Sequence, residues 1–412
     1  MRALREARFY RGQAQSAFRQ AAGVPGATSG ELTRGSEARM SLDNDLYPRD
    51  RVERAAEAAR AAGLGALLLT PGADLRYLTG YEAKQLERLT CLVVPASGAP
   101  FLVVPRLELA AAQASPAGKL ESDGLEIVAW EETADPYALI AGRLGAVDSV
   151  GLADRMWAMM VLAFRKAMPA ARQVLAGTVL RELRMIKSGA EIEALAEAGA
   201  AIDRVHQQVP ALLRPGRTER EVGADIAEAI VAEGHATVDF VIVGSGPNAA
   251  SPHHEVSDRK LRPGDAVVVD IGGTMASGYC SDCTRTYAIG SPPPEFTAYY
   301  EVLRAAQDAA CTAVKPGTTA EGVDAAARDP ITAAGYGEQF IHRTGHGIGL
   351  ESHEEPYIVA GNTEPLRPGM AFSVEPGIYP GPHGARIEDI VVCTADGARR
   401  LNNVTRELVT VG

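Results

Sequence analysis

Leu261 begins the segment LRPGDAVVVDIG, and Leu366 begins a close copy of it, LRPGMAFSVEPG. Each copy reads as a short buried strand that carries an acidic residue, Asp270 in the first and Glu375 in the second. A second pair of similar segments precedes them, because PGRTEREV lies upstream of the first copy and PGTTAEGV upstream of the second. The repetition predicts one fold unit that occurs twice, with a site between the halves where the two acids lie.

A further acidic residue follows each strand at the spacing expected for a β-hairpin. Asp270 and Asp282 are equidistant from Ala276, so an antiparallel hairpin folded there would place them directly opposite each other on one face. Glu375 and Glu388 are likewise symmetric about the middle of the loop YPGPHGA. Like charges that face each other across strands destabilise a sheet unless they are neutralised. The mirrored pairs therefore predict bound cations.

Histidines are concentrated in the same part of the chain. One of them, in TGHGIGL, has glycines on both sides that let the backbone approach a ligand closely. Four carboxylates and one imidazole form an oxygen-rich set, which suits Mn²⁺, Co²⁺ or Fe²⁺ better than a thiolate-type structural zinc site. Five ligands exceed what one catalytic ion takes, whereas two ions about 3.5–4 Å apart could share bridging carboxylates. The predicted metal ligands are Asp270, Asp282, His346, Glu375 and Glu388.

Separate structural explanations compete with the metal site. A single acid at a strand end is usually a turn or cap residue, but mirrored spacing in two repeats favours a joint site. Cys280 and Cys283 have the spacing of a redox or zinc pair, yet they flank Asp282 on one predicted strand without a second pair, which favours packing. The remaining histidines are interpreted as ordinary core or surface residues (His206, His235) or are left outside the catalytic set (His254, His383).

Composition excludes several classes of protein. The chain has 412 residues and a net charge of −11, without a basic run of the kind that binds nucleic acid. No apolar stretch approaches the roughly 20 residues that a membrane span needs. The five cysteines are scattered and odd in number, which suits a reducing compartment. We therefore expect a cytoplasmic protein that binds neither nucleic acid nor membrane.

Three regions are predicted along the chain. Residues 1–45 are arginine-rich and lack the apolar core of a signal peptide. They are predicted to be a disordered leader or an over-long reading frame with Met40 as the natural start, with an organelle-targeting segment as the less favoured alternative. Residues 46–176 are predicted to form a small α/β domain, with a helix over Val52–Ala62, a strand at ALLLT and a hairpin of CLVVP and FLVVP.

Residues 177–412 are predicted to form the catalytic domain. A long helical stretch over Arg181–Val209 opens it, with Ser188 and Glu191 spaced as a capping box for the main helix and Pro210 and Pro215 bounding its end. The remaining chain shows the same order of predicted elements twice, two helices followed by strands. This order predicts a sheet backed by helices.

The chain also resembles a known family. The segments SGPNAASPHH, VVVDIGG, YCSDCTRTY, HRTGHGIGLESHEEP, FSVEPGIY and RIEDIVV occur in the order found in the pita-bread metallopeptidases. These include methionine aminopeptidase, aminopeptidase P and prolidase, with creatinase as a metal-free relative. The region before residue 177 is similar to the smaller domain of the proline-specific branch. The resemblance implies an α/β (α+β) fold in which a creatinase/prolidase-type N-terminal domain precedes a duplicated pita-bread catalytic domain.

The same resemblance assigns roles around two divalent ions, Mn²⁺ or alternatively Co²⁺. Asp270 and Asp282 are implied to hold the first ion, His346 and Glu375 to complete the second, and Asp282 and Glu388 to bridge the pair. Glu375 is also implied to pass a proton from the nucleophile towards the leaving prolyl nitrogen.

Four further residues are implied to surround the substrate. His253 and His353 would hydrogen-bond the substrate and the tetrahedral intermediate as catalytic residues outside the metal shell. His342 would line the pocket on the proline side, and Arg386 would support the bridging carboxylate or the substrate.

The implied activity is hydrolysis of the Xaa-Pro imide bond in dipeptides or short proline-containing peptides by a homodimer. This bond lacks an N–H and has a fixed φ, so it needs a dedicated pocket. A prolidase (Xaa-Pro dipeptidase) cleaves only dipeptides and requires a group that binds their free carboxylate, which the sequence does not locate. Prolidase activity is favoured, and aminopeptidase P activity on longer peptides is the alternative. A creatinase-like hydrolase or a non-catalytic peptide-binding module is less favoured, because the carboxylate set is complete.

Overall fold

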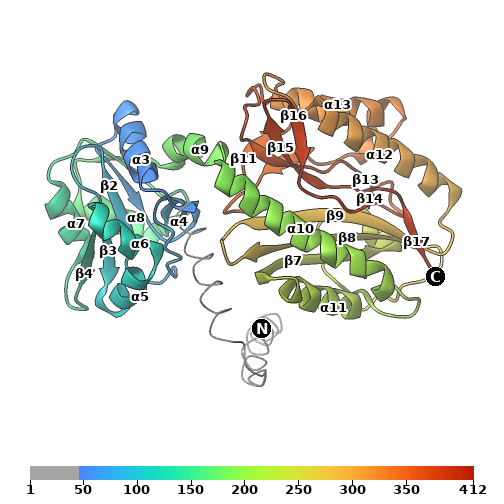
Figure 1. Cartoon of the computed structure of the whole chain (residues 1–412), viewed down its shortest axis with the longest axis horizontal. Helices are drawn as coiled ribbons and strands as arrows, with labels where there is room; N and C mark the ends of the chain where they lie inside the picture. The colour runs from blue at the N-terminus through green and yellow to red at the C-terminus, as the bar shows by residue number, and fades with distance from the viewer. Residues whose placement is uncertain (1–45) are drawn as a thin grey trace, which may run out of the picture. The chain divides into compact units, whose positions relative to one another are not determined.

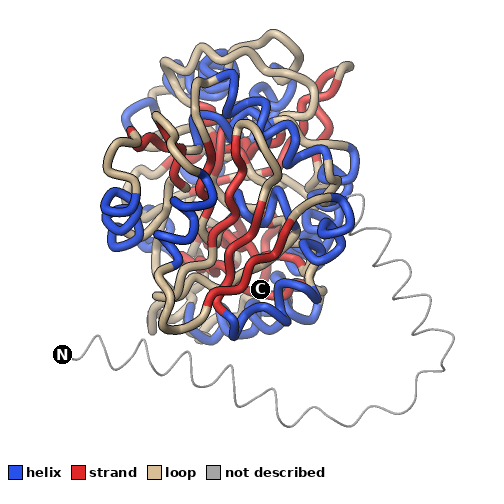
Figure 2. The backbone as a smooth tube through the Cα atoms, turned by 90° about the vertical axis from the view of Figure 1, so that its left-hand side faces the viewer, coloured by secondary structure: helices blue, strands red, loops and turns tan. Residues whose placement is uncertain are grey.

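The structure is a computed structural model that describes residues 46–412 (Figure 1). The predictions made for residues 1–45 lie outside the described residues. A six-stranded mixed sheet comes first, in the order β4-β3-β2-β1-β5-β6, and Figure 2 shows helices on both sides of it. Its strands are β1 (Ala66–Leu69), β2 (Cys91–Pro95), β3 (Phe101–Pro105), β4 (Glu126–Trp130), β5 (Ser149–Leu152) and β6 (Arg172–Leu175).

The central strands of this sheet are buried on both faces. Every residue of β1, β2 and β3 is buried, so helices must cover both sides. Along β1, Leu67 and Leu69 join one apolar cluster, while Ala66 and Leu68 join another on the opposite face. The predicted hairpin is confirmed, since β2 and β3 pair in antiparallel fashion. The helices are α3 (Asp50–Ala61), α4 (Ala73–Thr79), α5 (Leu109–Ala114), α6 (Pro116–Lys119), α7 (Pro136–Leu144) and α8 (Ala158–Ala167).

Two helices replace the single long helical stretch predicted from the sequence. They are α9 (Gly177–Met185) and α10 (Gly189–Leu212). The short segment between them ends at Ser188, the N-cap residue of α10. The predicted capping box is confirmed, because the Ser188 hydroxyl accepts from the Glu191 amide and the Glu191 carboxylate accepts from the Ser188 amide. This box satisfies amides at the first turn that have no helical partner.

The end predicted for this helix was wrong. Pro210 lies inside α10 rather than beyond it. A proline cannot donate to the carbonyl one turn earlier, that of His206, and usually breaks the helix for this reason. Here the Tyr287 hydroxyl donates to that carbonyl at 3.2 Å, so the helix continues through the proline.

The predicted duplication is confirmed in the second part of the chain. Helices α11 (Glu219–Ala232) and α13 (Ala320–Ala333) begin after equivalent threonines, each of which accepts a bond from a first-turn amide. Each threonine also forms an isolated β-bridge to the segment before its LRPG strand, Thr218 to Lys260 and Thr319 to Pro365. The two copies therefore repeat long-range contacts as well as sequence.

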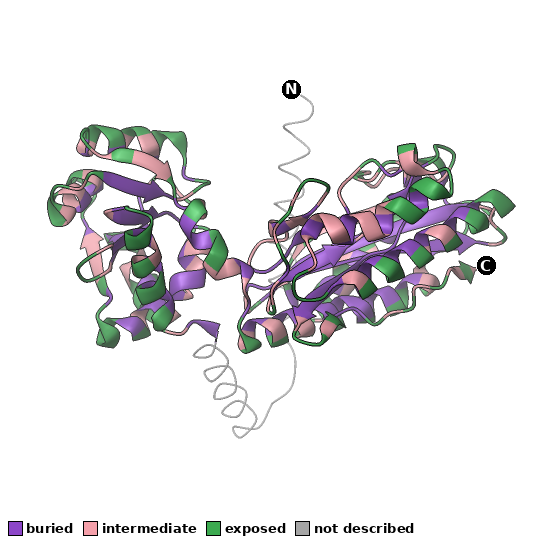
Figure 3. Cartoon of the chain, turned by 90° about the horizontal axis from the view of Figure 1, so that it is seen from above, coloured by how far each residue is buried: buried purple, intermediate pink, exposed green. Residues whose placement is uncertain are grey.

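Each copy supplies most of one sheet and the helices that cover it, while the last strand of the chain, β17, joins the first sheet. The first sheet has the order β17-β9-β8-β7 and packs against α10 and α11, while the second has the order β11-β10-β12-β15-β16 and packs against α12 (Pro294–Ala313) and α13. Figure 3 shows the strands largely buried and the helices with exposed outer faces. None of the helices within residues 46–412 combines the length and apolar character that crossing a membrane requires. The strands are β7 (His235–Ser245), β8 (Ala266–Met275), β9 (Cys280–Ile289), β10 (Gly345–Gly347), β11 (Glu354–Ile358), β12 (Ala371–Val374), β13 (Gly377–Ile378), β14 (Ala385–Arg386), β15 (Asp389–Thr394), β16 (Gly397–Arg400) and β17 (Val409–Val411).

The register predicted for the first hairpin was wrong by one pair of residues. In the β8–β9 ladder, Asp270 pairs with Thr284 and Gly272 pairs with Asp282, so the two acids are diagonal rather than directly opposite. They still share one face, because side chains alternate with a period of two along a strand. Diagonal neighbours remain close enough to interact.

The turn between these strands explains the shift. The Met275 carbonyl accepts a hydrogen bond from the Gly278 amide, and the Met275 amide donates one to the Tyr279 carbonyl. The hairpin therefore folds about Ser277 instead of Ala276. Gly278 has a φ of 90°, a conformation that favours glycine. Turn geometry sets the register of a hairpin, and symmetry of the acids alone could not reveal it.

The second hairpin has the predicted register. Val374 of β12 pairs with Asp389 of β15, and the two-stranded sheet β13–β14 continues in the same alignment. Glu375 and Glu388 thus occupy matched positions between the two ladders, as predicted.

Candidate metal centre

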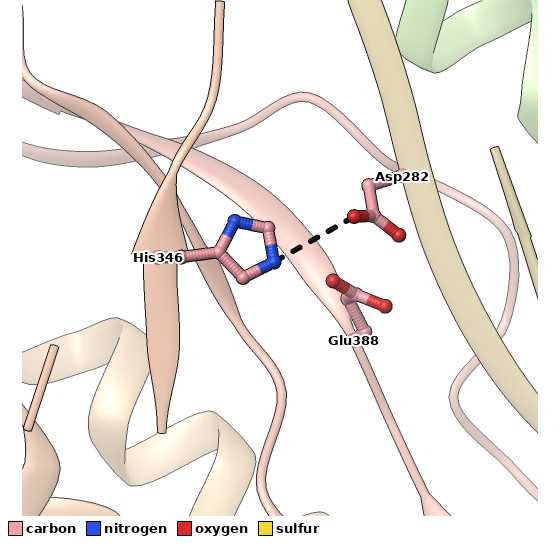
Figure 4. A group of neighbouring side chains, drawn as sticks. All are labelled: Asp282, His346 and Glu388. Carbon is pink, nitrogen blue, oxygen red and sulfur yellow. Dashed lines mark ion pairs between the residues drawn. The ribbon is translucent and has the colours of Figure 1, made fainter. Parts of the chain in front are cut away.

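Acidic residues from both copies converge with one histidine. Asp282 on β9, His346 on β10 and Glu388 before β15 offer ligand atoms that all lie within 4.8 Å of one another (Figure 4). From His346 Nε2, the distance is 3.7 Å to Asp282 Oδ2 and 3.2 Å to Glu375 Oε1. Asp270 lies on the same face of the first hairpin as Asp282. The structure therefore brings the five predicted ligands to one place.

The pKa values show the cost of burying these acids together. Burial, followed by repulsion from Glu388, Asp270 and Glu375, raises the pKa of Asp282 well above its ordinary value. Burial and the neighbouring carboxylates also raise the pKa of Glu388. Glu375 behaves oppositely: burial opposes ionisation, but the hydrogen bond with His346 prevails and lowers its pKa to about 2. Such a cluster cannot ionise fully unless cations neutralise it.

Two buried oxygens fit the same explanation. Within the described chain, Asp270 Oδ1 and Glu388 Oε1 are buried without a hydrogen-bond partner. Buried carboxylate oxygens normally find a donor or a metal ion. Because the donor set is carboxylate and imidazole, it fits divalent ions such as Mn²⁺ or Co²⁺.

Two hydroxyl groups that the sequence analysis missed orient the ligands. The Ser373 hydroxyl donates to Glu375 Oε1 at 2.9 Å and accepts from the His346 amide at 3.0 Å. The Thr284 hydroxyl donates to Glu388 Oε2 at 2.7 Å. Each lies two residues before or after a predicted ligand, Thr284 after Asp282 within β9 and Ser373 before Glu375 at the end of β12, so the period-two alternation could have identified both.

Arg386, from the second copy, contacts Asp270 and Thr284 of the first copy and Tyr379 of its own copy. Its guanidinium pairs with Asp270 Oδ2 at 2.6 Å and donates to the Thr284 hydroxyl at 3.1 Å and to the Tyr379 hydroxyl at 2.8 Å. The predicted support of the bridging carboxylate is therefore indirect, through Thr284 to Glu388, whereas the direct ion pair is to Asp270. Tyr379 was missed because nothing in its local sequence distinguishes it.

The backbone carbonyl of Arg343 determines the tautomer of His342. His342 Nδ1 lies 2.7 Å from the Arg343 carbonyl, which can only accept, so Nδ1 carries the hydrogen. Nε2 then accepts from the Tyr379 hydroxyl at 2.9 Å. Burial lowers the pKa of His342, in keeping with a neutral ring. This residue lies near the cluster, beside Tyr379, which also contacts Arg386.

His353 and His253 lie outside the cluster of ligands. The His353 ring is 3.9 Å from the His346 ring, measured between centroids, and it lines a cleft of about 860 Å³. Partial desolvation and the nearby His346 lower the pKa of His353 to about 4, although its ring remains accessible from the cleft. His253 is exposed on a loop, and its charge also acts on His353.

A buried glutamate holds the loop that carries His253. Glu219 accepts hydrogen bonds from Ser245 and Ser257, and its carboxylate lies 2.8 Å from His254 Nε2. His254 is therefore held by Glu219, whereas the neighbouring His253 is exposed. Glu219 was missed in the sequence, because its partners come from distant segments.

The remaining polar candidates have structural roles. Cys280 and Cys283 are buried free thiols whose pKa values are raised by burial, which confirms the packing interpretation. His206 is a core histidine, 3.0 Å from both the Tyr287 hydroxyl and the Cys283 carbonyl. His235 is likewise buried, 2.8 Å from the Ser281 hydroxyl.

Ion pairs across the cleft fix the segment that carries His353. Arg184 of α9 pairs with Asp74 of α4 at 2.8 Å and with Glu351 at 2.7 Å. It also pairs with Glu354, which Lys187 contacts at 2.5 Å. The residues flanking His353 are thus tied to both parts of the described chain.

Comparisons with known proteins agree with this arrangement. Residues 193–395 match Metallopeptidase family M24, and residues 51–186 match the Creatinase/Prolidase N-terminal domain. A protein of Mycobacterium tuberculosis named Probable dipeptidase PepE is 57% identical over 372 residues, which cover 90% of this chain and 98% of that protein. The Xaa-Pro dipeptidase of Lactobacillus delbrueckii subsp. lactis is 37% identical over 358 residues, covering 84% and 95%.

A solved structure is similar over nearly the same length. The crystal structure of dipeptidase PepE from Mycobacterium ulcerans matches with a TM-score of 0.84 and 58% identity, covering 90% of this chain and 99% of that chain. These similarities confirm the predicted fold class, a creatinase/prolidase-type N-terminal domain followed by a pita-bread catalytic domain.

Proposed function

The chain belongs to metallopeptidase family M24, and we propose that it is a two-metal Xaa-Pro dipeptidase. The observation that carries the proposal is the buried group of Asp282, His346 and Glu388, with Glu375 3.2 Å from His346 and Asp270 on the same face of the hairpin as Asp282. In this set, one oxygen of Asp270 and one of Glu388 lack a hydrogen-bond partner within the described chain. Relatives named dipeptidase and Xaa-Pro dipeptidase support the substrate class. Aminopeptidase P activity on longer peptides is the alternative.

The proposed ligands divide between two sites. Asp270 and Asp282 would hold one ion, His346 and Glu375 would complete the other, and Asp282 and Glu388 would bridge them. Such ions supply Lewis acidity, which lowers the pKa of a water molecule and polarises a carbonyl oxygen. We propose Mn²⁺ or Co²⁺ because the donor set is rich in oxygen.

The protein's own residues would bind the substrate and move the proton. Glu375, already ionised through its contact with His346, would accept a proton and deliver it to the leaving prolyl nitrogen. His353 and His253 would hydrogen-bond the substrate from the cleft. His342 would lie on the proline side, held in one tautomer by the Arg343 carbonyl and oriented by the Tyr379 hydroxyl.

The proposal extends to the setting of the protein. We propose a cytoplasmic homodimer that acts on short proline-containing peptides, without nucleic acid or membrane partners. The net charge of −11 and the absence of a basic run support the second part.

Hydrolysis of matched peptides tests the proposed function. A Xaa-Pro dipeptide and a Xaa-Pro-Xaa tripeptide would be incubated with protein loaded with Mn²⁺, with metal content measured on the same sample. We expect two ions per chain and faster cleavage of the dipeptide. Preferential cleavage of the tripeptide would favour aminopeptidase P, and cleavage of neither would refute the peptidase proposal.

A further inference from the structure

Most cations around the metal centre are neutralised by carboxylates of the protein itself. Arg386 pairs with Asp270 at 2.6 Å, and Arg328 pairs with Asp324 at 2.8 Å. In the cleft, Arg155 pairs with Glu351 at 2.7 Å. A guanidinium held in this way offers little free charge to a ligand.

Arg343 differs from these arginines. Its guanidinium lies over the ring of Tyr357, 4.4 Å from the ring centroid. Among residues 46–412, it has no carboxylate partner, and no side-chain hydrogen bond of its guanidinium is found. Stacking on an aromatic face orients a guanidinium while leaving the N–H groups along its edge available for a planar anion.

The position of this arginine relates it to the metal centre. Tyr357 pairs directly with His346 in the β10–β11 ladder, and it lines the cleft together with His353. Arg343 follows His342, the residue proposed on the proline side. Its positive charge is also felt at His353, whose pKa it helps to lower.

An Xaa-Pro dipeptide carries a carboxylate on the ring carbon next to the scissile nitrogen. The same position in a longer peptide is an uncharged amide. The glutamates of the cleft are already paired with its arginines, Glu351 with Arg155 and both Glu351 and Glu354 with Arg184, so these arginines offer little free charge to a carboxylate. Discrimination between the two substrate classes therefore requires an unpaired cation near the proline side.

We propose that Arg343, stacked on Tyr357, binds the free carboxylate of the substrate and selects dipeptides over longer peptides. This inference rests on the proposed Xaa-Pro hydrolase function and names the specificity determinant of the same site. The planar fork matches a carboxylate in bidentate fashion, which lysine cannot reproduce.

The test compares an Xaa-Pro dipeptide with the corresponding Xaa-Pro amide, which lacks only the negative charge. The measured quantity is the ratio of kcat/KM for the acid to kcat/KM for the amide. This ratio cancels differences in folding and metal content between variants. We expect Arg343→Met to lower it by about 10- to 100-fold, mainly through a higher KM for the acid. Arg343→Lys should fall between the wild type and Arg343→Met.

Arg155→Met is the matched control, because it removes an arginine from the same cleft that is already paired with a carboxylate. Its ratio should stay close to that of the wild type. An equal loss on both substrates in Arg343→Met, or a collapse of the ratio in Arg155→Met, would overturn the assignment. A wild-type protein that cleaves acid and amide equally well would refute the carboxylate anchor while leaving the peptidase function standing. A metal-loaded wild type that cleaves neither would refute both.

Discussion

The two copies of the duplicated unit carry an acid at the same position but build the strand around it differently. In the first copy, β8 and β9 form an uninterrupted ladder in which Asp270 and Asp282 are both paired residues. In the second copy, β12 ends at Val374 and pairing resumes only at Gly377. The first copy is a continuous platform, whereas the second is broken at its acid.

The break has an identifiable cause and a consequence. Pro376 follows Glu375 and cannot donate to a ladder, so pairing stops there. The Glu375 amide donates to the Thr344 carbonyl instead, and the Glu388 amide donates to Thr284 of the first copy. The interruption thus frees the amides of Glu375 and Glu388 to bond to other segments. These bonds bring the acids of the second copy beside those of the first.

Removal of the metal ions should have the largest effect, because both copies contribute ligands to one charge cluster. Treatment with a chelator should abolish cleavage of an Xaa-Pro dipeptide. Mn²⁺ or Co²⁺ should restore it better than Ca²⁺, which prefers more and longer oxygen contacts. Activity would be measured beside metal content, and full activity in a verified metal-free sample would contradict the two-metal proposal.

Asp282→Asn should be the most damaging substitution in the continuous copy. A neutral amide cannot bridge two cations, so we expect loss of metal and a fall in kcat/KM of more than about 1000-fold. Without metal, the variant should unfold at a higher temperature than wild type, because the raised pKa of Asp282 reflects an unfavourable buried charge. Asp239→Asn, an exposed acid on β7, is the control and should change neither property. Retention of both ions by Asp282→Asn would refute its bridging role.

His353→Ala should instead separate chemistry from metal binding. The ring lies beside His346 but outside the ligand cluster, so both ions should remain. We expect kcat to fall by about 100-fold with a smaller change in KM, since its contact is made in the transition state. Loss of metal comparable to that of Asp282→Asn would place His353 among the ligands.

The continuous copy was largely predictable from local sequence. Its strands, its two acids and their common face follow from apolar runs and period-two alternation. The register of the β8–β9 hairpin could not be predicted in this way. It depends on the backbone conformation of Gly278 in the turn, and the spacing of the acids carries no information about that conformation. Similarly, Pro210 remains inside a helix because of Tyr287, a residue from another segment.

The residues that support the site were harder to foresee for the same reason. Glu219 and Tyr379 act through partners that are distant in sequence. Arg343 becomes informative only when the absence of a carboxylate around it, within the described residues, is known. The four acids could be proposed as ligands because the duplication displays them as two pairs, whereas the residues that support them occur once.

A third substitution exchanges a residue of one copy for its counterpart. His206 on α10 and Gln307 on α12 are equally distant in sequence from the threonine caps of α11 and α13. Both contact strand carbonyls, His206 that of Cys283 at 3.0 Å and Gln307 that of Val374 at 3.5 Å. Burial, with a contribution from a nearby arginine, lowers the pKa of His206 to about 3. Only the first copy therefore carries a titrating group here.

The sign of the resulting pH dependence follows from this lowered pKa. The folded protein keeps His206 neutral, while the unfolded chain binds a proton below about pH 6.5, so stability falls as the pH decreases from 6.5 towards 3. Between pH 7 and pH 5, wild type should lose about 2 kcal/mol more than His206→Gln. Chemical denaturation at both pH values measures this difference. Parallel losses in the two proteins would show that His206 is not held neutral.

The smallest effects should come from removing the hydroxyl groups that orient the acids. One of these hydroxyls lies in each copy, so the two substitutions compare the copies directly. Thr284 of the continuous copy supports Glu388 of the interrupted one, whereas Ser373 supports Glu375 within its own copy. Each loss should weaken metal affinity by about 10-fold, as for other residues that hold a ligand in place. Thr284→Val should cost more than Ser373→Ala, because Thr284 serves two charged groups, the Glu388 carboxylate and the Arg386 guanidinium, whereas Ser373 serves one carboxylate and the neutral His346 amide. Competition with a chelator measures the affinities, and Thr284→Ser, which keeps the hydroxyl, is the control. A larger loss in Ser373→Ala would mean that the interrupted copy orders its acids from within, and that the link from the continuous copy contributes little.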